Sequence, residues 1–159
     1  MNSDSGKSYT IKEATLKLMQ YCAYRDRSQK EVEDKLLEMR MIPEARELII
    51  IQLMREDFLN EERFARSFVR GKFRIKRWGR IKIKQELKFK EISSPIVKIA
   101  LTEIDEKEYL DTLHLLAQKK IELLKEPNKL KRRKKLTDHL LQKGYESNLV
   151  FEVVGDLFN

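Results

Sequence analysis

Apolar residues recur along most of the chain at the spacing of an amphipathic α-helix. Ala14, Leu18 and Cys22 lie four residues apart, and Val32 and Leu36 keep the same interval. Residues three or four positions apart share one face of a helix, so each set predicts a buried helical stripe. Glycine and proline, at 5 and 3 of 159 residues, are scarce, which disfavours folds rich in turns. These patterns predict an all-α protein.

Polar residues mark where several of these helices begin. Ser28, with Glu31 three residues later, forms a capping box in which each side chain bonds the other residue's backbone N–H. Asn60 is a second candidate cap. Pro43 and Pro95 suit the first turn of a helix, where no backbone N–H is needed.

The apolar pattern also repeats about every 50 residues. Leu36, Leu87 and Leu140 align at offsets of 51 and 53 residues, and four further apolar columns agree across the three copies. These columns are Met41, Ile92 and Tyr145; Ala45, Ile96 and Leu149; Ile49, Ala100 and Val153; and Leu53, Ile104 and Leu157. Three-helix units with this period stack on their neighbours in a quasi-linear array.

We therefore predict three tandem three-helix repeats that form an elongated, curved, solenoid-like array. Residues 1–9 are predicted to be a flexible tail, and the repeats to cover residues 10–58, 59–105 and 106–159. The nine expected helices cover about 10–24, 28–40 and 43–56; 60–75, 79–90 and 95–104; and 106–125, 130–143 and 147–158.

One segment permits a second interpretation. From Phe73 to Lys84 apolar and polar residues alternate, with Trp78 and Gly79 in the middle, which is the pattern of a β-hairpin. The register of the repeats instead makes this segment a helix end, a turn and a helix start, and we favour that prediction.

The positive charge is concentrated in two blocks. The chain carries a net charge of +8, but residues 63–90 hold 12 basic residues against the single acid Glu86, and residues 129–135 hold six against none. The remaining segments are mildly acidic. Like charges at this density repel one another unless a polyanion neutralises them, and nucleic acid is the commonest such partner. An acidic protein surface is the other candidate partner.

The residue inventory argues against an enzyme. His114 and His139 are the only histidines and Cys22 the only cysteine, and none lies at metal-ligand spacing from another ligand. Glu86 and Lys88 have the Glu-x-Lys spacing of some metal-dependent nucleases, but those motifs need a strand and an upstream aspartate. No Gly-rich phosphate loop is present. We expect no catalytic site, no metal and no cofactor. The chain also lacks a membrane-length apolar run, so we expect a soluble, cytoplasmic protein.

Several segments resemble the RecX family of recombination regulators. The strongest match is the helix NEERFARSFVR at 60–70, followed by Trp78-Gly79 and the sequence IKQEL at 83–87. Residues 25–37 resemble the first-repeat signature of that family, and residues 113–120 and 139–145 give a looser third-repeat match. The resemblance spans about residues 12–158. One departure is Glu91-Ile92-Ser93, which replaces a Lys-Gly-Ile type ending, so we expect a different turn there.

The resemblance implies a function that the composition does not show. RecX proteins are built of tandem three-helix repeats, lie in the groove of the RecA–DNA filament, and inhibit its ATPase, strand-exchange and coprotease activities. They also bind DNA. By resemblance we expect a monomeric, non-enzymatic regulator in homologous recombination, DNA repair and the SOS response. Whether it prefers single- or double-stranded DNA, and whether it caps filaments or lies in their groove, stays open.

The clustered cations are the candidate contacts to DNA and to the RecA filament. Arg66, Arg70 and Arg74 follow one another at intervals of four on a helix face distinct from the buried stripe that includes Phe64 and Phe68. Trp78 is either a contact residue or a packing residue. The predicted interface consists of Arg63, Arg66, Arg70, Arg74, Lys76, Arg77, Trp78, Arg80, Lys84, Lys88, Lys131, Arg132, Arg133 and Lys135.

The second block is expected to precede the middle helix of the third repeat, in the slot equivalent to residues 74–80. Equivalent slots of a solenoid lie on one side, so both blocks would then line one surface. The alternative is a basic loop with no binding role.

Two other functions remain as alternatives. Three-helix units also occur in helix-turn-helix transcription regulators, which place one helix in the major groove and bind palindromic sites as dimers. A helical scaffold whose basic face binds an acidic protein, without nucleic acid, is the other. The absence of a heptad seam favours a monomer.

Overall fold

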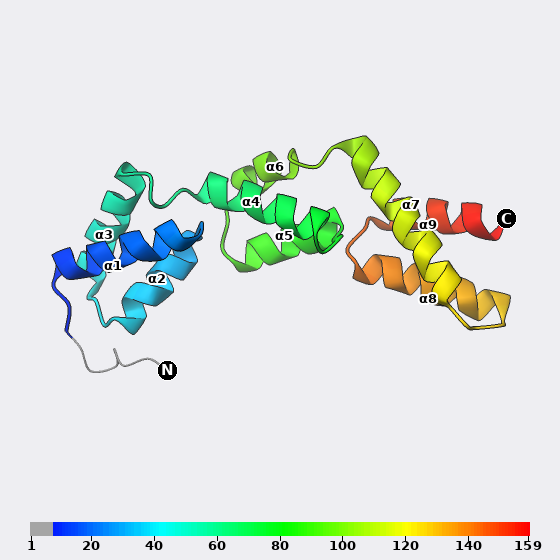
Figure 1. The fold of residues 1–159 in the computed structure, drawn as a ribbon, viewed down its shortest axis with the longest axis horizontal. Coiled ribbons are helices and arrows are strands. Elements are labelled where there is room, and N and C mark those ends of the chain that lie inside the picture. The colour runs from blue at the N-terminus through cyan, green and yellow to red at the C-terminus, as the bar shows by residue number, and fades with distance from the viewer. Residues whose placement is uncertain (1–7) are drawn as a thin grey trace.

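The computed structural model describes residues 8–159, and within that range the chain forms nine α-helices and no strand (Figure 1). The helices are α1 (Ile11–Tyr24), α2 (Gln29–Glu38), α3 (Pro43–Arg55), α4 (Glu61–Arg74), α5 (Arg80–Phe89), α6 (Ser94–Leu101), α7 (Glu106–Leu123), α8 (Lys129–Gln142) and α9 (Ser147–Phe158). The predicted all-α fold is confirmed.

The helices form three groups of three that follow one another along the long axis of the molecule (Figure 1). Within each group the third helix packs against both preceding helices: α3 against α1 and α2, α6 against α4 and α5, and α9 against α7 and α8. We call these groups repeats 1, 2 and 3. The N-terminal and C-terminal groups lie at opposite ends, as a tandem repeat array requires.

The three aligned leucines occupy equivalent buried positions in the three repeats. Leu36, Leu87 and Leu140 are completely buried, each on the middle helix of its repeat. The predicted helix starts are also present: Ser28 and Glu31 form a full capping box, and the Asn60 side chain accepts from the backbone N–H of Arg63. Pro43 and Pro95 both lie in the first turn of their helices.

The turn after each middle helix has the same backbone form in all three repeats. It passes through one left-handed residue, which is Arg40 (φ 60°), Glu91 (φ 62°) or Gly144 (φ 100°). The N–H of Ile92 bonds the Leu87 carbonyl across this turn, as its counterparts do in the other repeats. The expectation of a different turn at Glu91 was therefore wrong, because a non-glycine residue adopts the required left-handed conformation at that position.

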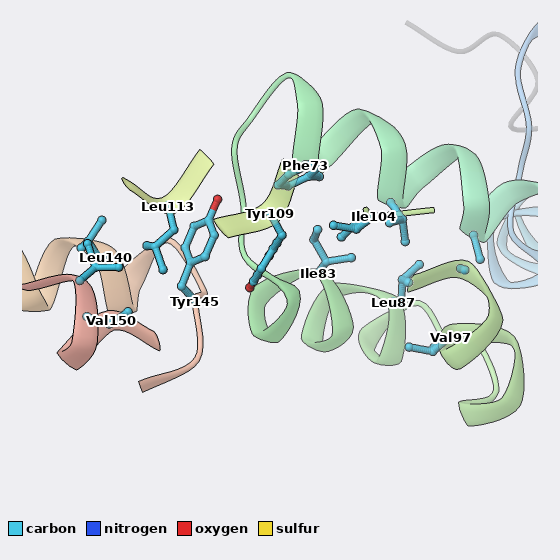
Figure 2. Packing of buried hydrophobic residues seen from close by; sticks show 14 of the residues in the cluster. Phe73, Ile83, Leu87, Val97, Ile104, Tyr109, Leu113, Leu140, Tyr145 and Val150 are labelled. Carbon is cyan, nitrogen blue, oxygen red and sulfur yellow. The ribbon is translucent and has the colours of Figure 1, made fainter. Parts of the chain in front are cut away.

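The alternating segment at 73–84 is helical on both sides of a short connection. Helix α4 runs to Arg74 and α5 starts at Arg80, with Gly79 as its N-cap. Packing against the other helices decides the outcome, because Phe73 and Ile83 both point into the core between α4, α5 and α7 (Figure 2). The β-hairpin alternative is wrong.

The buried side chains form two separate cores. The first lies within α1, α2 and α3 and is centred on Leu18, Leu36 and Ile49. The second is continuous from α4 to α9. At its centre the rings of Phe73, Tyr109 and Tyr145 succeed one another, with centroids 5.8 and 5.0 Å apart, so that repeats 2 and 3 share one core (Figure 2).

Two glycines allow repeats 2 and 3 to approach this closely. The backbone N–H of Gly79 donates to the Lys143 carbonyl (2.8 Å), and the N–H of Ile81 donates to the Gly144 carbonyl (2.9 Å). A methyl group at Gly79 would overlap the Gly144 backbone, and one at Gly144 would overlap Lys82. At this junction the backbones of repeats 2 and 3 are therefore in direct contact.

The junction between repeats 1 and 2 is polar instead. The repeat register places Ser28 where repeat 2 has Gly79, and Glu91 where repeat 3 has Gly144. The contacts here are ion pairs and hydrogen bonds, such as the Gln29 N–H donating to Glu61 (3.1 Å). No buried apolar cluster crosses this junction within the described part of the chain.

The predicted tail of residues 1–9 lies almost entirely outside the described residues. Its last residue, Tyr9, packs half-buried against the core of repeat 1, and its hydroxyl accepts from Lys17 (3.1 Å).

Candidate nucleic-acid interface

The connection between α4 and α5 presents cations to solvent. The chain turns through Arg77, whose φ of 61° is typical of the residue that follows a helix end. The Arg77 carbonyl accepts from the Tyr145 hydroxyl (3.0 Å), which fixes the turn on repeat 3. Arg74 and Lys76 are exposed and have no ion-pair partner among the described residues. Their charges are available to a ligand.

Two arginines of the predicted interface hold a carboxylate of their own repeat. Arg66 and Arg70 both bond Glu103, at 2.6 and 2.9 Å, and Arg66 also pairs with Glu62. Hydrogen bonds from the two guanidinium groups lower the pKa of Glu103 below its usual value. Glu103 follows α6, so this pair fastens the end of α6 to α4. The predicted row of three free arginines is therefore reduced to Arg74.

Arg63 and Arg80 fasten the repeats to each other. Arg63 binds Asp26 of repeat 1 (2.7 Å) and Asp57 (3.0 Å). Arg80 binds Glu146 (2.8 Å) and Glu106 (3.0 Å) of repeat 3. Their guanidinium groups are thus neutralised inside the molecule, and both arginines serve the fold.

Arg80 belongs to a partly buried polar cluster at the junction between repeats 2 and 3. Its guanidinium lies 3.9 Å from the ring centroid of Tyr109, whose hydroxyl accepts from the Arg80 N–H and donates to Glu146. Burial, together with the nearby Glu146 carboxylate, raises the pKa of Tyr109 well above its usual value. This network was not predicted, because its partners come from three helices.

Trp78 packs half-buried against the core shared by repeats 2 and 3. The ammonium groups of Lys72 and Lys82 lie 4.8 and 4.4 Å from its ring centroid. Both are within the range of cation–π attraction. The ring therefore packs on the protein and also orients two lysines that the predicted interface omitted.

Phe68 differs from its predicted place in the buried stripe of α4. The stripe consists of Phe64, Ala65, Val69 and Phe73, whereas Phe68 is half-buried. Lys72 and Lys90 place their ammonium groups 5.3 and 5.7 Å from its ring centroid. Phe68 covers the edge of the core rather than filling it.

Lys84 and Lys88 lie on the exposed side of α5, as predicted. They line a groove between α5 and α6, whose opposite side carries a third lysine, Lys98. Sequence reasoning did not select Lys98, because it stands alone among apolar residues of α6. The repeat register could have drawn attention to Lys98, because it aligns this lysine with Glu47 of repeat 1, a residue of opposite charge.

The second basic block forms the first half of α8. Asn128 caps this helix, which begins at Lys129, within one residue of the predicted start at about 130. Neither a position before the helix nor a basic loop is correct. Lys131 and Arg133 are exposed without ion-pair partners in the described residues, whereas Lys135 binds Glu126 (3.3 Å).

Arg132 is partly withdrawn from solvent. Its guanidinium lies 5.8 Å from the ring centroid of Phe158, and its Nε is buried without a hydrogen-bond partner among the described residues. Arg132 therefore packs on α9, while its neighbours Lys131 and Arg133 face solvent.

The two basic regions lie at opposite ends of α8. Lys143, which follows α8, donates to the Lys76 carbonyl in the α4–α5 connection (3.1 Å). Lys131 is twelve residues earlier, a distance of about 18 Å along a helix. The α4–α5 connection therefore lies near the C-terminal end of α8, and the second basic block lies at its N-terminal end.

The other residues that the sequence offered as candidates, Cys22, His139, Glu86 and Lys88, all lie within helices. Burial raises the pKa of the Cys22 thiol. His139 is half-buried, and burial together with Lys120 and Lys143 lowers its pKa. Glu86 and Lys88 lie on a helix. No group of three or more metal-ligating side chains occurs in residues 8–159. In the same range, no helix has the length and apolar character needed to cross a membrane.

Comparisons with known proteins identify two of the three repeats. Family models for the second and third three-helix domains of RecX match residues 60–101 and 106–154. The regulatory protein RecX of Prosthecochloris aestuarii is 31% identical over 137 residues, which cover 86% of this chain and 88% of that protein. RecX of Clostridium perfringens strain 13 is 35% identical over 135 residues, covering 84% of this chain and 63% of that protein.

The solved structures agree with the sequence relatives. A crystal structure of RecX from Lactobacillus salivarius matches with a TM-score of 0.83 and 26% identity, covering 92% of this chain and 96% of that one. Several curated relatives are longer, so the chain spans about half to two thirds of their length. On the strength of these matches, the chain belongs to the RecX family of regulatory proteins.

Proposed function

We propose that this protein binds the RecA–DNA filament and limits its ATPase, recombinase and coprotease activities, acting by binding and without catalysis. Family membership supports the regulatory role, since the relatives are named as regulatory proteins. On this proposal it acts as a monomer in the cytoplasm, in homologous recombination, DNA repair and the SOS response.

We assign the DNA contacts to four exposed cations that have no ion-pair partner among the described residues. These are Arg74 at the end of α4, Lys76 in the α4–α5 connection, and Lys131 and Arg133 on α8. A cation that already holds a carboxylate gains little from a phosphate, because the phosphate must displace that carboxylate. An unpaired cation releases counterions from the DNA when it binds, which is the main source of affinity.

The observation that carries this assignment is the division of the arginines on α4. Arg74 is exposed and has no ion-pair partner among the described residues, whereas Arg66 and Arg70, two turns and one turn before it, share Glu103. The same helix thus offers both a binding variant and its control.

The test compares two double variants. Arg74→Glu/Lys76→Glu is expected to weaken binding to bare DNA by more than tenfold while melting like the parent. Arg66→Gln/Arg70→Gln is expected to lower the melting temperature by a few degrees and to leave DNA affinity within about threefold. Fluorescence anisotropy with a labelled single strand and a labelled duplex measures the affinities. Equal losses of affinity in the two variants would contradict the assignment.

A further inference from the structure

A groove of about 640 Å³ runs between α5 and α6 on the surface of repeat 2. Apolar side chains from both helices line it, including Ile81 on α5 and Val97 and Leu101 on α6. Ile81 is 41% exposed, so the groove presents part of its apolar surface to solvent.

Three lysines surround these apolar side chains. Lys84 and Lys88 stand on α5 and Lys98 on α6, all exposed. None has an ion-pair partner among the described residues, and no carboxylate lines the groove. The site therefore combines an apolar surface with uncompensated positive charge.

Repeat 1 has the corresponding groove, whose charged side chains are two glutamates and Arg46. The groove between α2 and α3 is lined by Glu33, Glu47 and Ile50, which the register aligns with Lys84, Lys98 and Leu101. The groove thus follows from the architecture of the repeat, whereas the lysines are particular to repeat 2. Packing within the repeat does not require Lys84 or Lys98, since glutamates occupy these two positions in repeat 1, while Leu37 stands at the position of Lys88.

We infer that the α5–α6 groove binds an acidic amphipathic helix of a protein partner. Its apolar face would cover Ile81, Val97 and Leu101, and its carboxylates would meet Lys84, Lys88 and Lys98. Helix α5, with ten residues, is about 15 Å long, so two to three turns of the partner fit against it. This inference rests on the proposed function in one respect: it takes RecA in the filament as the protein that supplies this helix.

A nucleic acid fits the groove less well. Proteins that bind single strands stack the bases on aromatic side chains, and no aromatic side chain lines this groove. Phosphates would leave the apolar side chains uncovered. Helix-in-groove recognition instead uses both features, since apolar anchors enter the groove and charges on its edge set the partner and its orientation.

The first experiment uses a synthetic probe. An approximately 16-residue helical peptide carries leucine at intervals of three and four residues and glutamate on the flanking positions, and a matched peptide carries glutamine in place of glutamate. Titrated into the ¹⁵N-labelled full chain, the acidic peptide should shift amide signals of α5 and α6 and bind at least tenfold more tightly than the glutamine peptide. Equal affinities, or shifts confined to other helices, would overturn the inference.

The second experiment exchanges the charges of the groove. Lys84→Glu/Lys98→Glu gives repeat 2 the residues that repeat 1 already holds at these positions, so it should melt like the parent. It should lose at least tenfold in affinity for the acidic peptide. Lys12→Glu/Lys119→Glu is the control, because it makes the same change of net charge at exposed positions on α1 and α7. If the control weakens the peptide equally, the groove is not the site.

The third experiment separates the possible occupants. Lys84→Glu/Lys98→Glu should weaken binding to the RecA filament at least fivefold relative to the control, with affinity for bare DNA matching that of the control. A loss on bare DNA as large as on filament would mean that nucleic acid occupies the groove, which overturns the inference. If the parent does not bind the filament, the proposed function fails, while the peptide titration still decides whether the groove binds an acidic helix.

Discussion

Gly79 and Gly144 carry the closest contact between repeats 2 and 3. Gly144 has a φ of 100°, and a side chain there would meet the backbone of Lys82. Two further glycines, Gly71 and Gly155, lie in helices with open space around them. The same residue type therefore serves opposite purposes in this chain, and substitutions should separate them.

We predict that Gly144→Ala lowers the free energy of unfolding of repeats 2 and 3 by about 1–3 kcal/mol from backbone strain, with the overlap on Lys82 adding to it. Gly71→Ala should raise it by about 0.5–1 kcal/mol, because alanine loses less conformational entropy in a helix. Urea denaturation followed by circular dichroism measures both changes. Two alanine variants with the same midpoint would contradict the role of Gly144.

The tyrosines at this junction predict an alkaline limit to stability. Burial raises the pKa of Tyr109 and Tyr145 well above the usual value in the folded chain. Their contribution is therefore fully present below the unfolded pKa of about 10 and is lost as the pH rises beyond it. We expect repeats 2 and 3 to lose stability above pH 10. The pH dependence of the urea midpoint measures this, and a midpoint that stays constant from pH 9 to pH 11 would contradict it.

Individual arginines were the least predictable part of the candidate site. Charge density and spacing located the basic segment, but they did not distinguish Arg66, which holds Glu103, from Arg74, which has no ion-pair partner among the described residues. Glu62 and Asp57 are close in sequence to the arginines that they bind, but Glu103, Glu106 and Glu146 lie 26 to 66 positions away from theirs. Only the packing of the helices brings them together, so local sequence contains no sign of them.

At the scale of the helices, local sequence was a better guide. Ser28, Asn60 and Pro43 start helices where the capping rules place them. The alternation at 73–84 was ambiguous by itself, and the repeat register resolved it correctly. The helix predicted at about 130–143 is present as α8, but the expectation that the second basic block precedes this helix was wrong, because Asn128 caps the helix and residues 129–135 lie within it.

The position of the second basic block on a regular helix leads to a salt prediction. If Lys131 and Arg133 each contact one phosphate, Lys131→Gln/Arg133→Gln should reduce the slope of log affinity for DNA against log salt by about 1.5, at roughly 0.7 to 0.9 per contact. Anisotropy titrations at several salt concentrations measure the slope. Lys134→Gln/Lys135→Gln is the control, because both lysines already pair with acids. An unchanged slope in the first variant would remove α8 from the interface.

At the scale of the whole molecule, the two cores predict two units of stability. The core of α1–α3 is separate, whereas α4–α9 share one core and a backbone junction. Smaller cores bury less surface and open more readily. We expect amides in α2 and α3 to exchange with deuterium faster than those in α5 and α8. Equal protection in both units would show that the polar junction couples the repeats as strongly as the apolar one.

The central claim is that this RecX-family chain restrains RecA on DNA, and one measurement tests it directly. The rate of ATP hydrolysis by RecA on single-stranded DNA is followed while the protein is added up to equimolar amounts. The proposed function predicts a progressive fall in rate, with a weaker effect from Arg74→Glu/Lys76→Glu. An unchanged rate up to an equimolar amount of the parent protein would contradict the claim.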